Sequence, residues 1–115
     1  MNRVIFTPLA KQDYENLVPV LYDGGYFSNK EDAHKYVDEL VNDIKVNLPM
    51  RAKRKVPDFF SDRYGEGLYY AVFPKNRRTH WYVFFKMYQM NSETYYQIRY
   101  IDNNHSIARF LRHFD

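Results

Sequence analysis

The chain has 115 residues, no cysteine and a formal net charge of +3. This length supports a single hydrophobic core, so we expect one domain over residues 1–115. The lack of cysteine excludes disulfides and zinc sites built from thiolates. No stretch approaches the roughly 18 to 20 apolar residues of a membrane span. These features predict a soluble cytoplasmic domain with no membrane partner.

The positive charge is concentrated in one part of the chain. Residues 51–78 carry 8 cations against 3 anions, whereas residues 1–50 carry 5 against 8 and residues 79–115 carry 4 against 3. A local excess of this kind indicates a binding site for an anionic partner more than a general solubility device.

The N-terminal segment predicts a strand that leads directly into a helix. The run "RVIF" at 3–6 is of β type, and Thr7 with Pro8 is a typical helix start. The helix would bury Leu9, Leu17, Val18 and Leu21, and we expect Pro19 to kink or shorten it. The "DGG" at 23–25 ends it.

A second helix follows with a stronger signal. "SNKE" at 28–31 fits a capping box between Ser28 and Glu31. An apolar stripe of about four turns then comprises Ala33, Tyr36, Val37, Leu40, Val41, Ile44 and Leu48. Pro49 ends this helix, and the two helices should pack as a hairpin.

Three β-type runs follow the basic segment, at 68–73, 79–90 and 94–101, with short polar connections that predict an antiparallel meander. In the last run, alternation would put Tyr96, Ile98 and Tyr100 on one face. Tyr95, Gln97, Arg99 and Ile101 would lie on the other, so we expect Arg99 to point away from the helices. The tail "SIARFLRHF" has the spacing of a short closing helix. The fold class is therefore α+β, in the order β-α-α-β-β-β, with a helical hairpin on one face of a twisted sheet and the other face open if the first strand joins.

This pattern resembles the RelE/ParE superfamily of toxins from type II toxin–antitoxin systems. The resemblance covers most of the chain and is clearest in "YYAVFPKNRRTHWYVFFKMY" and "YYQIRYIDNNHSIARFL". It implies a single toxin domain neutralised by an antitoxin peptide, which we expect to be acidic and to cover the helical hairpin or the basic face.

The resemblance leaves three functions open. RelE-like members cut mRNA on the ribosome without a metal or another cofactor, which would make the chain an endoribonuclease. ParE-like members inhibit DNA gyrase and need no acid–base group. A relative that is not toxic would use its aromatic sheet to bind another protein.

Candidate site residues follow from the chemistry of RNA cleavage, which needs a base, an acid and stabilisation of the phosphorane charge. The candidate catalytic residues are Arg99, His105, Tyr100 and Lys55. Candidate phosphate-binding residues are Arg51, Lys53, Arg54, Arg63, Arg77 and Arg78. Arg99 ranks first because placing a cation inside a strand costs free energy unless that face of the sheet is solvated or supplies a partner for the charge. Its alternative role is a salt bridge to Glu93 or Asp102. For His105 and the basic run 51–55, the alternatives are a surface or capping histidine and a solvated loop.

Overall fold

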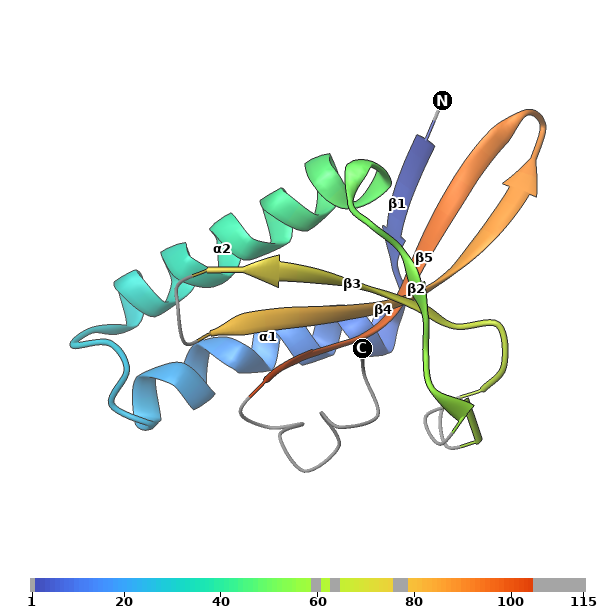
Figure 1. Ribbon diagram of the computed structural model, residues 1–115. Coiled ribbons are helices and arrows are strands. Elements are labelled where there is room, and N and C mark those ends of the chain that lie inside the picture. The colour runs from blue at the N-terminus through green and yellow to red at the C-terminus, as the bar shows by residue number, and fades with distance from the viewer. Residues whose placement is uncertain (1, 59–60, 63–64, 76–78, 105–115) are drawn as a thin grey trace.

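The computed structural model describes residues 2–58, 61–62, 65–75 and 79–104. The elements are β1 (Asn2–Phe6), α1 (Pro8–Asp23), α2 (Lys30–Asn47), the 3-10 helix η1 (Leu48–Met50), β2 (Arg54–Lys55), β3 (Tyr69–Pro74), β4 (His80–Met90) and β5 (Glu93–Asn103). The two helices lie side by side on one face of a twisted sheet (Figure 1). The predicted α+β class is confirmed.

The sheet has five strands in the order β1-β5-β4-β3-β2. The three C-terminal strands form the predicted antiparallel meander. β1 joins the sheet beside β5 and runs parallel to it, which makes the sheet mixed. The two-residue strand β2, which the sequence did not predict, adds to the opposite edge.

Helix α1 begins where the sequence predicts, with the Thr7 hydroxyl oxygen accepting a hydrogen bond from the Ala10 amide at 3.1 Å. The helix continues through Pro19 to Asp23, so Pro19 does not shorten it. Leu9 is 72% exposed, because the buried stripe passes through Ala10 instead.

Helix α2 begins one residue later than predicted. Its N-cap is Asn29 and not Ser28. The Asn29 side-chain oxygen accepts a hydrogen bond from the Asp32 amide at 2.8 Å. Asparagine caps a helix as well as serine does, and the Asn29 amide also bonds the Asp32 carboxylate. The helix ends at Asn47, and η1 then carries Pro49.

The main core lies between the helices and the sheet. Its fully buried side chains include Leu40 and Ile44 from α2 and Trp81, Val83 and Phe85 from β4. The Trp81 indole nitrogen donates a hydrogen bond to the Tyr36 hydroxyl at 2.9 Å. This bond satisfies the polar atom that comes with a buried tryptophan.

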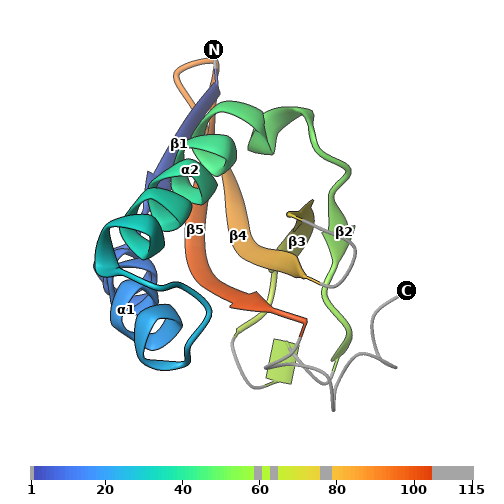
Figure 2. The same ribbon diagram turned by 90° about the vertical axis from the view of Figure 1, so that its left-hand side faces the viewer.

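A second, smaller core lies on the face of the sheet that the helices leave uncovered, called here the outer face. Val56, Leu68, Tyr70 and Phe84 are buried there, and Val72, Tyr82 and Tyr100 pack against them. Figure 2 shows the helices on one side of the curved sheet and the chain around β2 on the other. The expectation of a wholly open face is therefore wrong, because the chain around β2 covers part of it.

The predicted closing helix at 106–114 lies outside the described residues. Within the described ranges, no helix has the length and apolar character that crossing a membrane requires.

Removal of the Tyr36 hydroxyl tests the polar link inside the core. Tyr36→Phe leaves the Trp81 indole N–H without its acceptor, and we expect a loss of about 1 to 3 kcal/mol in the free energy of unfolding. Tyr26 is 70% exposed, so Tyr26→Phe is a matched control that should stay within about 0.5 kcal/mol. Chemical denaturation measures both. Equal effects from the two substitutions would contradict this role for the hydrogen bond.

Candidate nucleic-acid interface

The hairpin of β4 and β5 positions a group of polar side chains on the outer face. Its turn residues Asn91 and Ser92 have φ values of 52° and 64°. Two residues with positive φ form the tight turn that suits the twist of a hairpin. The register that follows pairs Lys86 with Gln97 and Tyr88 with Tyr95. These four side chains share the outer face, because Met87 and Tyr96, which lie between them on the two strands, pack in the main core.

A β-bulge interrupts this hairpin at Arg99. Phe85 pairs with Ile98 and Phe84 pairs with Tyr100, so Arg99 is the extra residue without a partner across the ladder. Beyond the bulge, Tyr100 joins the outer cluster while Ile101 joins the main core. The simple alternation predicted from the sequence is therefore wrong for Tyr100 and Ile101, since the bulge exchanges their faces.

The Arg99 side chain lies along the outer face, as predicted, and is held by two neutral groups. Its Nε donates to the Gln97 side-chain oxygen at 2.8 Å, and its Nη2 donates to the Tyr88 hydroxyl at 3.1 Å. Neither partner carries a negative charge, so the positive charge is not neutralised by these contacts. A guanidinium has five N–H donors, which leaves donors to spare for a phosphate.

The two carboxylates considered as partners for Arg99 have other partners. The Glu93 carboxylate accepts from the Arg3 Nε at 2.9 Å and from the Tyr95 hydroxyl at 3.0 Å. The hydrogen bond and charge of Arg3, with the bond from Tyr95, lower the pKa of Glu93. The same hydrogen bond raises the pKa of Arg3. This ion pair ties β1 to the start of β5, at the far end of that strand from Asp102.

Asp102 bonds to the candidate residue Tyr100. The Tyr100 hydroxyl donates to one carboxylate oxygen at 2.8 Å, and the other oxygen accepts from the Asn103 amide at 2.8 Å. Burial raises the pKa of Asp13, on α1, and the negative charge of Asp102 adds to this effect. The Tyr100 ring packs on Phe84, with centroids 5.6 Å apart. The Tyr100 ring therefore belongs to the outer cluster, and its hydroxyl is hydrogen-bonded to the Asp102 carboxylate.

The basic run 51–55 divides into two pairs with different surroundings. Lys53 donates from Nζ to the carbonyl oxygens of Pro49 at 2.8 Å and Arg51 at 3.0 Å, which fixes the turn after η1. The Arg51 guanidinium lies over the Phe73 ring, 4.8 Å from its centroid. Arg54 and Lys55 form β2 and are exposed.

Arg54 and Lys55 emerge on opposite faces of the sheet. Arg54 pairs with Tyr70 of the outer cluster, whereas Lys55 pairs with Tyr69, which packs against the main core. Successive residues of a strand point to opposite faces. Arg54 thus shares the outer face with Arg99, and Lys55 does not. The structure brings Arg99, Tyr100 and Arg54 to one face and leaves Lys55 on the other.

A wedge-shaped pocket opens where β2 diverges from β3. It encloses about 340 Å³, and its lining consists of Arg51, Ala52, Arg54, Tyr70, Ala71, Val72 and Tyr82. The β2–β3 ladder comprises the pairs of Arg54 with Tyr70 and Lys55 with Tyr69, so the wedge begins directly beside the first of these. We call it the wedge pocket. It combines two guanidinium groups with two tyrosines.

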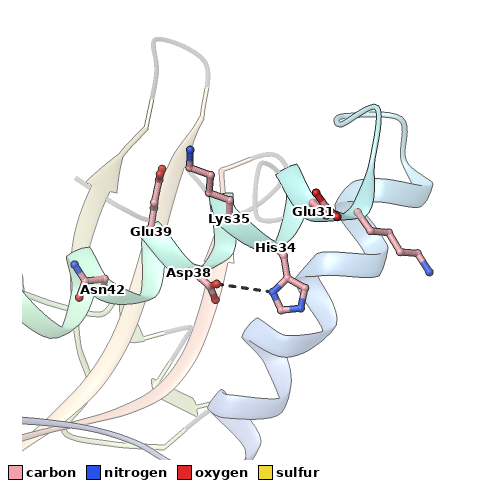
Figure 3. A pocket seen from close by; sticks show the side chains of 7 residues that line it. Glu31, His34, Lys35, Asp38, Glu39 and Asn42 are labelled. Carbon is pink, nitrogen blue, oxygen red and sulfur yellow. Dashed lines mark ion pairs between the residues drawn. The ribbon is translucent and has the colours of Figure 1, made fainter.

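A larger hollow, of about 560 Å³, lies along the solvent-facing side of α2. Figure 3 shows its charged side chains projecting from one helix, with the ion pair between His34 Nδ1 and Asp38 Oδ2 at 3.9 Å. Acids and bases alternate along this helix, which is typical of a solvated helix face. It presents no concentration of one charge sign and adds nothing to the candidate site.

Four predicted site residues, Arg63, Arg77, Arg78 and His105, lie outside the described residues. The sequence analysis missed Tyr88 as a hydrogen-bond partner of Arg99 and Lys86 as a cation on the same face. The signal was present, because a two-residue turn at 91–92 fixes the register of the whole hairpin. Across the described ranges, no group of three or more His, Asp or Glu side chains could hold a metal ion.

Comparisons with protein-family models, with curated proteins and with solved structures gave no match.

Deletion of Arg99 tests whether the bulge exists around this one residue. Without it, Ile98 precedes Tyr100 directly, and regular alternation restores the three observed pairs with Phe85, Phe84 and Val83. We expect the deletion variant to unfold cooperatively, at a melting temperature close to that of Arg99→Ala. Deleting Gln97 instead shifts the preceding residues of β5 by one position, so that their side chains turn to the opposite face of the sheet. This deletion should lower the melting temperature much further. Similar losses for both deletions would contradict the assignment of the bulge.

The Arg3–Glu93 ion pair predicts a dependence of stability on pH. Because the pKa of Glu93 is lowered in the folded state, its contribution is present above its ordinary pKa of about 4.3 and is lost as the pH falls through the folded value. Glu93→Gln should therefore lower the melting temperature at pH 7, and this difference should vanish in acid. Arg3→Ala added to Glu93→Gln should have little further effect. A difference that is independent of pH would contradict this account.

Proposed function

We propose that the chain is a toxin of the RelE type, an endoribonuclease that cuts mRNA on the ribosome without a metal, with the outer face of its sheet as the RNA-binding surface. The observation that carries the proposal is Arg99, whose guanidinium is held on this face by Gln97 and Tyr88, two neutral hydrogen-bond acceptors. A buried or neutralised arginine would not serve this purpose. The resemblance of the sequence to the RelE/ParE superfamily supplies the reaction class.

In this proposal, Arg99 binds the scissile phosphate and stabilises the negative charge that develops on it. A preorganised cation is effective because it needs no rearrangement as the reaction proceeds. Gln97 and Tyr88 position the guanidinium, and Lys86, which pairs with Gln97 on the same face, adds positive charge. The hydroxyl of Tyr100, bonded to Asp102, is the proposed proton-transfer group on this face. His105 remains the second proposed acid or base.

The proposed antitoxin is an acidic peptide that covers the basic outer face. Lys55 points to the other face of the sheet from Arg99, so it is placed outside the proposed chemistry. Charge complementarity of this kind favours fast association and a defined partner.

Induction of the chain in a bacterial host tests the proposal, with growth and primer extension on a translated mRNA as readouts. We expect growth arrest and cuts confined to translated regions, both abolished by Arg99→Ala. Arg99→Lys should restore little, because an ammonium cannot reproduce the planar fork. Arg3→Ala is the matched control, since it removes an arginine of the same face that is already paired with Glu93.

Three outcomes would overturn the proposal. Arrest with DNA damage and intact mRNA would favour gyrase as the target. Cuts that persist in Arg99→Ala would move the chemistry away from the outer face. Normal growth with the wild-type chain, confirmed as folded and present, would favour a protein-binding relative that is not toxic.

A further inference from the structure

The wedge pocket has the properties of an anion site separate from Arg99. Its two arginines have no ion-pair partner in the described part of the chain, where the observed pairs join Arg3 to Glu93 and His34 to Asp38. Arg51 is half-buried, and the contact of its guanidinium with the Phe73 ring favours a position at this edge of the sheet. Arg54 is exposed beside it.

The edge of β3 adds a backbone donor to the wedge. The amide of Val56 donates to the Leu68 carbonyl across the β2–β3 ladder, whereas the amide of Lys75 donates to the Thr79 carbonyl on the β4 side. Backbone groups alternate in direction along a strand. The N–H and C=O of Val72 are therefore directed toward β2, into the wedge.

The wedge pocket and Arg99 lie on the same face and are separated by a fixed number of strands. Arg54, Tyr70, Phe84 and Tyr100 form one cross-strand row, and Arg99 directly precedes Tyr100. Three strand spacings amount to about 14 Å. A stacked nucleic-acid strand advances about 3.4 Å per nucleotide, so about four nucleotides cover this distance.

We propose that the wedge pocket, with Arg51, Arg54 and the Val72 amide, is a second phosphate site for the same single RNA strand that binds at Arg99. This inference rests on the proposed function and adds to it a spacing of contacts along the strand: one phosphate at Arg99 and another about four nucleotides away. Tyr82, half-buried in the lining of the pocket, offers a ring edge beside the strand. A short substrate reaches one site, and a longer one reaches both.

Binding of single-stranded oligoribonucleotides of different length to the full chain tests this inference by fluorescence anisotropy. We expect a hexanucleotide to bind at least about tenfold more tightly than a dinucleotide, because it neutralises cations at both sites. Arg54→Ala should remove most of this length advantage. The double substitution Arg51→Ala with Arg54→Ala should remove all of it and reduce the dependence on salt by about one to two phosphate contacts.

Two controls keep the test specific. Lys35→Ala removes a cation from the solvent-facing side of α2 and should change neither affinity nor length dependence. Thermal melts show whether the arginine variants remain folded, and Arg54→Ala, at an exposed position, is the variant least affected by folding. Arg99→Ala should weaken dinucleotide and hexanucleotide alike.

A length advantage that persists in the double variant would overturn the inference. Failure here and failure of the proposed function are distinguishable. If toxicity depends on Arg99 but the length advantage is unchanged in Arg54→Ala, the proposed function stands and the second phosphate site is contradicted. If the length advantage depends on Arg54 but the chain causes neither growth arrest nor mRNA cleavage, the RNA-binding surface stands and the nuclease activity is contradicted.

Discussion

The bulge at Arg99 is the feature on which both faces of the sheet depend. A regular β5 would send Tyr100 toward the helices and Ile101 away from them, but one unpaired residue reverses both. Ile101 can then join the main core, and Tyr100 can close the outer cluster. The residue left over is a cation, and the outer face is where it meets water. A single backbone irregularity therefore completes two hydrophobic clusters and presents Arg99.

The outer face is divided by the chain that follows α2. Val56 and Leu68 bury the aromatic row of Tyr70 and Phe84, so the part of the sheet nearest β2 is not available as a flat platform. What remains accessible is a polar region on the β4–β5 hairpin, around Arg99, and the wedge pocket at the β2 edge. The clustered cations of the sequence are thus distributed between two places and two tasks. Lys53 orders the turn after η1, Arg51 and Arg54 line the wedge pocket, and Arg99 lies on the hairpin.

Much of the fold was predictable because its signals are local. Thr7 with Pro8 marks the start of α1, the apolar stripe marks α2, and the short polar connections predict the meander. Local signals failed where two solutions have nearly equal energy. Asn29 and Ser28 are comparable caps, and Pro19 was compatible with the last turns of a helix that packing holds in place. The face of Arg99 was predicted correctly. Its contact with Tyr88 was not, because it depends on how β4 and β5 are aligned.

The sequence alone determined the class of fold, the order of its helices and long strands, and a basic segment that needs an anionic partner or solvent. These depend on periodicity and composition, which act over a few residues. The tertiary structure decided which cations share a face. Arg54 and Lys55 are adjacent in the chain yet point to opposite sides, because strand pairing with Tyr70 and Tyr69 fixes their directions. Arg54 and Arg99 are 45 positions apart in the sequence and share a face, because three strand pairings connect them.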